Sequence, residues 1–174
     1  MFLLTLDILD NRYGLLSTQQ IQELWVCSHS IFPLHPKGIF RITGFASSII
    51  LQQNEENWLM VNLPSPNVRE GWRIKSLMVR YRTSFSGGLG GFDKIGIRDS
   101  DAVIHEFTQL SLRSNNTWKT TKLDLPRPRP SRFGLGASVH VTGQVDIKDD
   151  APPPPNTLPP TTIEVVSIGL EFSR

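Results

Sequence analysis

Short runs of alternating apolar and polar residues recur from Gly38 to the C-terminus, between loops rich in Gly, Pro, Asn and Asp. Alternation with a period of two is the pattern of a half-buried β-strand, because successive side chains point to opposite faces. The clearest runs are residues 77–83, 94–98 and 163–172. The pattern predicts strands at 24–28, 38–44, 46–53, 57–63, 73–83, 93–99, 102–108, 117–125, 134–142 and 163–173.

Many short strands without a convincing interior helical pattern are typical of two packed sheets. We therefore predict an all-β protein, a two-sheet antiparallel sandwich of jelly-roll-like form. An immunoglobulin-type sandwich is the alternative, but Cys27 is the only cysteine, so the Cys…Trp…Cys spacing of that fold is absent. At 174 residues the chain is typical of one domain.

The first 24 residues differ from the rest. Ser17 is followed three residues later by Gln20, which resembles a capping box and predicts a short helix over residues 18–24. An extended arm is the alternative. We divide the chain into this arm or short helix, residues 1–24, and a β-sandwich domain, residues 25–174. Apolar side chains in the arm are costly to leave in water, so we expect them to pack on this domain or on a partner chain. The candidates for such contacts are Phe2, Leu3 and Leu6.

Two proline-rich segments interrupt the strand pattern. Residues 126–130 read Pro-Arg-Pro-Arg-Pro and are expected to end the preceding strand, because proline donates no hydrogen bond to a ladder. Residues 150–160 are expected to form an extended polyproline loop that protrudes between two strands. Such a loop loses little entropy on binding and could enter an aromatic-lined groove. The interaction candidates in it are Pro152, Pro153, Pro154 and Pro155.

The charge balance gives no general attraction to nucleic acid or to a membrane surface. There are 18 Lys and Arg against 16 Asp and Glu, a net charge of +2. Lys75, Arg80 and Arg82 lie close together on one predicted strand, but they fit its solvent face equally well, and we expect no nucleic-acid partner. No apolar run approaches the roughly 20 residues of a membrane span. The apolar opening residues lack a basic flank and are interrupted by Asp7 and Asp10, so we expect a cytoplasmic protein.

An ordered series of motifs resembles a family of small bacterial β-sandwich proteins of unknown function. The resemblance covers about residues 25–174 and implies the same fold, with no assigned activity. The 24 preceding residues and the polyproline loop depart from the shared pattern. The motifs are Trp25-Val26, Asn57-Trp58 leading to Leu63-Pro64-x-Pro66, the run Ser76 to Thr83, Ile95-x-Ile97-x-Asp99, the run Phe133 to Val139, and the run Val166 to Phe172.

Metal-binding and catalytic motifs are sparse. Asp99 and Asp101 could help to hold Ca²⁺, but two carboxylates in a hairpin are more often turn formers. Cys27, His29 and His35 lack the spacing of a structural zinc site. Neither a Gly-x-Ser-x-Gly elbow nor a His-Glu-x-x-His motif is present. We therefore expect no metal, no cofactor and no enzymatic activity, although a pair of acids that meet only in space would escape a motif search.

Tryptophans at strand starts and in loops give the sharpest candidate site. Exposed aromatic rings on a sandwich can stack against sugar rings. The candidates are Trp58, Trp72 and Trp118. The alternative is that these rings cap the core at the ends of the sandwich.

The sequence thus leads to one principal hypothesis about function. It is a non-enzymatic structural or protein-interaction module that self-associates or joins a larger assembly, through the apolar arm, the proline loop or exposed sheet edges. The alternative is a carbohydrate-binding module that uses exposed tryptophans.

Overall fold

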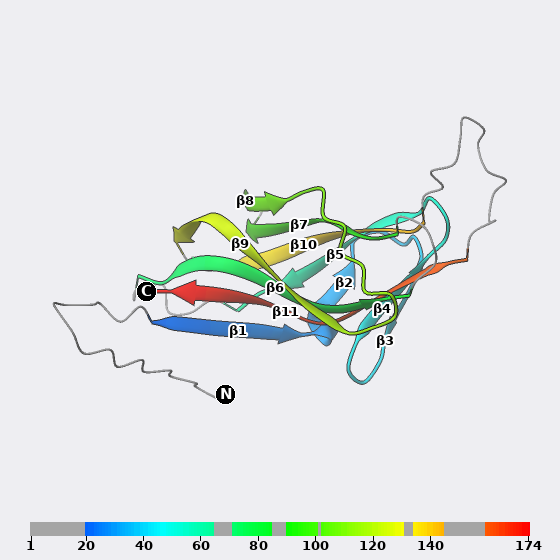
Figure 1. The fold of residues 1–174 in the computed structure, drawn as a ribbon, viewed down its shortest axis with the longest axis horizontal. Helices are drawn as coiled ribbons and strands as arrows, with labels where there is room; N and C mark the ends of the chain where they lie inside the picture. The colour runs from blue at the N-terminus through cyan, green and yellow to red at the C-terminus, as the bar shows by residue number, and fades with distance from the viewer. Residues whose placement is uncertain (1–19, 65–70, 85–89, 101, 131–133, 145–158) are drawn as a thin grey trace.

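Two antiparallel sheets pack face to face in the computed structural model, which describes residues 20–64, 71–84, 90–100, 102–130, 134–144 and 159–174 (Figure 1). This confirms the predicted all-β sandwich. One sheet, sheet A, contains β1 (Ile21–Cys27), β3 (Ile39–Ile42), β4 (Ser47–Leu51), β6 (Arg73–Thr83), β9 (Lys119–Pro130) and β11 (Thr161–Ser173). The other, sheet B, contains β2 (Ile31–Pro33), β5 (Glu56–Asn62), β7 (Gly91–Asp99), β8 (Ala102–Phe107) and β10 (Leu135–Thr142).

The order of strands brings distant segments together. Sheet A runs β3-β4-β11-β6-β9, and β1 pairs with the C-terminal part of β11. Sheet B runs β2-β5-β10-β7-β8. Between the sheets, the ring of Tyr81 on β6 meets that of Phe92 on β7 edge to face, with centroids 4.8 Å apart. Both rings are buried, so this contact joins the two layers at the core.

Strand β1 replaces part of the predicted N-terminal helix. Residues 21–24 are extended and pair with β11, so the helix over 18–24 is wrong for these residues. Leu24 and Val26 pack against the core, while Trp25 between them lies on the outer face over Gly169. Successive side chains point to opposite faces in a strand but not in a helix, so this arrangement requires a strand. Residues 1–19 lie outside the described ranges, and with them Phe2, Leu3 and Leu6.

The Pro-Arg-Pro-Arg-Pro segment does not end its strand, which is a second correction. Strand β9 continues to Pro130, and Arg129 and Pro130 pair with β6. The ladder skips from Asp124 to Arg129 through a bulge, and β9 is an edge strand, so the missing proline N–H groups cost no hydrogen bond on its open side. The predicted loop over 150–160 falls mostly outside the described ranges, as do Pro152, Pro153, Pro154 and Pro155.

Candidate functional site

The outer face of sheet B carries a row of side chains that centres on Trp58. In the register of the sheet, Trp58 on β5 lies opposite His140 on β10, and His140 lies opposite Lys94 on β7. The next outward row along the strands is Met60, Ser138 and Gly96. Small residues at the last two positions leave the middle of this face low, beside the large indole.

A groove of about 400 Å³ opens at this place. It crosses from β2 and β5 over β10 to the end of β7. Apolar side chains form one side of the groove, while hydroxyl, imidazole and guanidinium groups form the rest, so it suits a ligand with both an apolar face and polar edges. The lining residues are Leu34, His35, Trp58, Met60, Arg98, Ser100 and Ser138.

His140 holds the indole of Trp58 from the side of β10. The two ring centroids are 4.6 Å apart, with the planes tilted by 45°. The imidazole is hydrogen-bonded through Nδ1, which lies 2.6 Å from Asp93 Oδ1, and its Nε2 lies 3.4 Å from Oε2 of the exposed Glu56. Because the side chain of His140 is only 8% exposed, its packing restricts the movement of the indole.

The loop beside Trp58 is tied down by one buried amide. The backbone N–H of His35 donates to Asn57 Oδ1 (3.2 Å), and Asn57 Nδ2 donates to the carbonyl oxygens of His35 (2.9 Å) and Lys37 (2.6 Å). Asn57 is fully buried. It therefore fixes residues 34–37 as a wall beside the indole, where a second hollow of about 270 Å³ continues the groove past Glu56.

The three predicted tryptophans have different environments. Trp58 is half-buried and lines the groove. Trp72 is 9% exposed and belongs to the core, so it is no surface platform, and the core-capping alternative holds for it. Trp118 is half-buried on the side of sheet A, where Phe45 meets its ring at 6.1 Å between centroids and the Arg82 guanidinium covers it at 4.7 Å. The structure therefore brings none of the three together.

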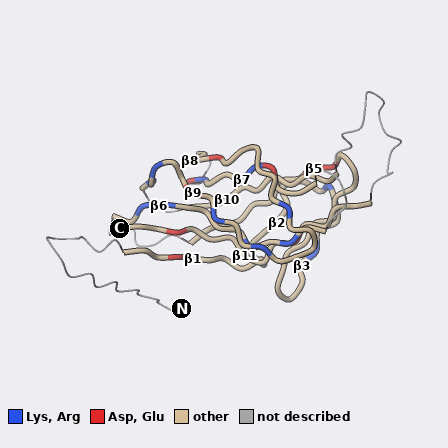
Figure 2. The backbone as a smooth tube through the Cα atoms, viewed as in Figure 1, with Lys and Arg blue, Asp and Glu red and all other residues tan. Residues whose placement is uncertain are grey.

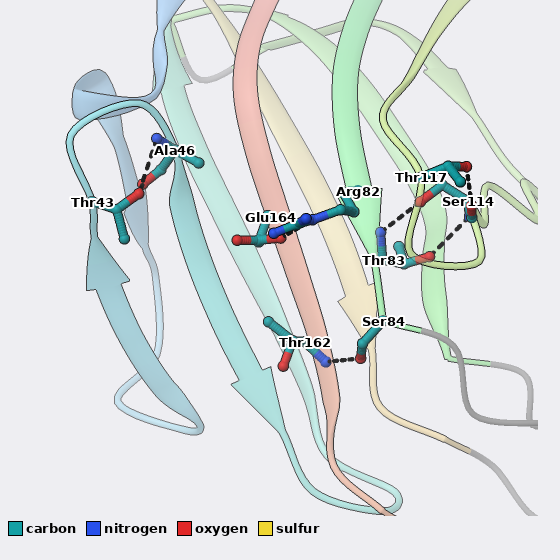
Figure 3. Close-up of polar contacts among 9 residues, drawn as sticks. All are labelled: Thr43, Ala46, Arg82, Thr83, Ser84, Ser114, Thr117, Thr162 and Glu164. Atoms are coloured by element: carbon teal, nitrogen blue, oxygen red, sulfur yellow. Dashed lines mark hydrogen bonds and ion pairs between the residues drawn. The ribbon is translucent and has the colours of Figure 1, made fainter.

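Two basic residues of β6 contact acidic residues of β11. Arg82 pairs with Glu164 across the two strands, as Figure 3 shows, and Lys75 Nζ lies 3.1 Å from Glu171 Oε1. Figure 2 shows the same neighbourhood of basic and acidic positions along β6 and β11. These pairs fit the interpretation that the cations belong to a solvated strand face.

Metal ligands do not gather in the part of the chain that the structure describes: no three His, Cys, Asp or Glu side chains there are arranged to hold an ion. Asp99 ends β7 and has a contact of its own, and Asp101 lies outside the described ranges. Cys27 is an exposed free thiol. The described residues also contain no helix long and apolar enough to cross a membrane.

Several solved structures similar to this chain are carbohydrate-binding modules. A low-affinity xylan-binding module, CBM86 from Roseburia intestinalis, is 10% identical with a TM-score of 0.51, and the match covers 87% of this chain and 96% of that one. A family 29 module is 12% identical, with a TM-score of 0.45 and coverages of 87% and 89%. The C-terminal CBM6 of a laminarinase from Zobellia galactanivorans is 11% identical, with a TM-score of 0.44 and coverages of 88% and 100%. The likeness to the CBM86 module shows the sandwich fold.

No family model matches the sequence, and no curated protein matches it. The family resemblance over residues 25–174 therefore stays a prediction.

Most groove residues were not among the candidates from sequence. Leu34 follows strand β2, a strand of three residues that the pattern did not predict. Arg98, Ser138 and His140 lie in predicted strands, and their alternation with Ile97 and Val139 places them on the outer face. That alternation was a usable signal for their orientation. It could not show that β5, β10 and β7 are neighbours, which is what assembles the groove.

Proposed function

We propose that this protein binds carbohydrate in the groove on the outer face of sheet B, with a sugar ring packed on the indole of Trp58. The single observation that carries the proposal is the position of Trp58, half-buried at the side of an open groove that also presents polar groups. A pyranose ring also has an apolar part and a polar part, with C–H groups on its faces and hydroxyls around its edge. Aromatic rings supply the apolar surface for such a face, and the polar groups orient the ligand.

A second exposed aromatic ring extends this apolar surface. Phe32 on β2 lies opposite Met60 on β5 and is 49% exposed. Leu34, which directly follows β2, lines the groove and is 55% exposed. Together with Trp58 these side chains form a continuous apolar strip along β2 and β5. The strip supports binding of more than one sugar ring.

The fold agrees with the proposal without identifying the sugar. The similar CBM86 structure is described as a low-affinity xylan-binding module. A xylan oligosaccharide is therefore one reasonable neutral probe for this chain, alongside a broad set of other glycans.

The test is binding to a glycan array, followed by calorimetry on the glycans retained. Trp58→Ala should lower affinity by about tenfold or more, as expected for truncation of a central aromatic contact. Trp118→Ala is the matched control, because Trp118 is also half-buried but lies away from the groove. Trp58→Phe should retain part of the affinity. Equal losses from Trp58→Ala and Trp118→Ala, or no glycan retained by the unaltered protein, would exclude this groove as the binding site.

We also propose self-association as a second candidate function. The edge hairpin of β3 and β4 exposes three large apolar side chains: Ile39 (51%), Ile42 (52%) and Phe45 (61%). Strand β3 is an open edge of sheet A, and unpaired edges favour pairing with another chain.

Light scattering at two concentrations tests the second candidate. A stable multiple of 19.6 kDa that falls to a single chain in the double variant Ile39→Lys/Ile42→Lys would support an interface at the hairpin. The contribution of the N-terminal arm is tested by removing residues 1–19, because a longer deletion would cut into β1. A single-chain mass for the unaltered protein would remove this candidate.

A further inference from the structure

The groove has an uneven distribution of charge. Arg98 and His35 contribute a guanidinium and an imidazole to its lining, and no carboxylate lines it. Carboxylates lie around the groove. Asp93 and Glu56 contact the imidazole of His140, and Glu56 also lines the hollow that continues the groove. Glu106 on β8 is exposed and lies opposite Gly96, so it shares the outer face with Lys94 and Arg98. Among the side chains that line the groove itself, the guanidinium of Arg98 is therefore the fixed charge, and it is positive.

Strand β7 presents its cations on the same face as Trp58. Lys94, Gly96 and Arg98 alternate outward, so two cations flank a position without a side chain. Arg98 lies opposite Gly136 on β10, and the absence of a side chain there leaves space above β10 between Arg98 and β5. A ligand that lies across β10 would thus meet the indole at one side and the guanidinium at the other.

We propose that the sugar bound in this groove carries an anionic group, a carboxylate or a sulfate, which pairs with Arg98 while a neighbouring ring packs on Trp58. This inference rests on the proposed carbohydrate-binding function. A guanidinium matches a carboxylate or sulfate through two parallel hydrogen bonds, and charged hydrogen bonds are about twice as strong as neutral ones. Arg98 also has an interaction within the protein, so a bound anion would share the five N–H donors of the guanidinium with that interaction.

The groove also offers hydroxyl groups for the remaining edge of the sugar. Ser138 is a buried residue of β10, and Ser100 follows β7 with its backbone N–H bonded to Gly134 O at 3.1 Å. Hydroxyls both donate and accept, so they suit sugar hydroxyls as well as an anion. The charge of Arg98 therefore selects among sugars, whereas the serines accept most of them.

The test is a glycan array that pairs each acidic glycan with its neutral counterpart: uronides with carboxyl-reduced uronides, and sulfated with desulfated oligosaccharides. We expect acidic members to bind about tenfold more tightly or better than their neutral partners. Comparing the uronide pairs with the sulfated pairs shows whether the protein prefers a carboxylate or a sulfate. Retention of neutral glycans alone, or equal affinity within pairs, would overturn this inference and leave the proposed function standing. Retention of no glycan would overturn both.

Variants separate recognition by Arg98 from general attraction of a polyanion. Arg98→Gln should remove the preference for the acidic member, measured as the ratio of the affinities for the acidic and the neutral member of each pair. Arg98→Lys keeps the charge but loses the paired geometry, so it should restore only part of the preference. Arg80→Gln is the control, since Arg80 is exposed on sheet A. Equal losses in Arg98→Gln and Arg80→Gln, or acidic binding that survives Trp58→Ala, would contradict the proposal.

Discussion

The imidazole of His140 packs against the indole of Trp58, with 4.6 Å between ring centroids, and its Nδ1 is hydrogen-bonded to Asp93 Oδ1 at 2.6 Å. The platform of the groove is thus built on a polar network as well as on the core. Trp58 comes from β5 and His140 from β10, and their pairing depends on the register of these neighbouring strands.

His140→Leu should therefore weaken ligand binding without changing the sandwich. It removes the ring contact and the hydrogen bond to Asp93, so we expect about three- to tenfold lower glycan affinity and a loss of about 1–2 kcal/mol in the free energy of unfolding. Calorimetry and urea unfolding measure the two effects. Glu56→Gln is the matched control, because Glu56 is exposed and its 3.4 Å contact should contribute little. Unchanged affinity in His140→Leu would show that Trp58 needs no support.

The pairing of β1 with β11 predicts a sensitive glycine. A Cβ at Gly169 would lie 2.7 Å from the Trp25 ring and 2.8 Å from the Leu24 carbonyl oxygen. Backbone cannot yield as a side chain can, so Gly169→Ala should cost about 1–3 kcal/mol in urea unfolding. Gly44→Ala is the control, because a Cβ there would have nothing within 4 Å. Equal stability of the two variants would mean that β1 does not lie against β11 in solution.

Glu171 predicts a pH-dependent contribution to stability. Burial acts to raise the pKa of this carboxyl, but hydrogen bonds and charge from Lys122 and Lys75 outweigh it, and the pKa lies below the usual value. A lowered pKa in the folded state means that the contribution is present above the pKa of the unfolded chain and is lost as pH falls through the folded pKa.

Glu171→Gln should accordingly be less stable than the unaltered protein by about 1 kcal/mol at pH 7. The difference should begin to shrink as pH falls below the pKa of a Glu in the unfolded chain, about 4.3, and should disappear once pH has passed the lower pKa of the folded state. Urea unfolding across pH 3–7 measures it, and Asp124→Asn is the control, since its carboxylate is 69% exposed and 4.0 Å from Lys122. A difference that persists at acid pH would show that packing, not charge, is responsible.

The contact between the two sheets predicts a large effect in the core. Phe92 is 1% exposed and meets Tyr81 from the opposite sheet. Phe92→Ala should lower the free energy of unfolding by about 3–5 kcal/mol. Phe32→Ala, at an exposed aromatic position, should change it by less than about 0.5 kcal/mol while weakening glycan binding. Similar stability losses in both variants would contradict the assignment of Phe92 to the core and Phe32 to the surface.

The fold class and nearly all strands could be predicted from the amino-acid pattern, because period-two alternation shows which faces of a strand are buried. It also placed Trp58 at the start of a strand, and it named carbohydrate binding as an alternative function. The prediction for β6 over 73–83 is the same as the strand in the structure. Two local predictions were wrong because strand pairing overrides the local pattern. Residues 21–24 form a strand because β11 lies beside them, and β9 continues through its prolines because it is an edge strand.

Which tryptophan lines a groove depends on the packing of strands that are distant along the chain. Trp58 and Trp72 both lie at predicted strand starts, yet one lines an open groove and the other fills the core. The partners of Trp58 are distant along the chain: His140 follows 82 residues later, and Arg98 reaches the groove from two strands away. Such meetings depend on strand order, which alternation along one strand does not specify, because every half-buried strand carries the same period whatever its neighbour.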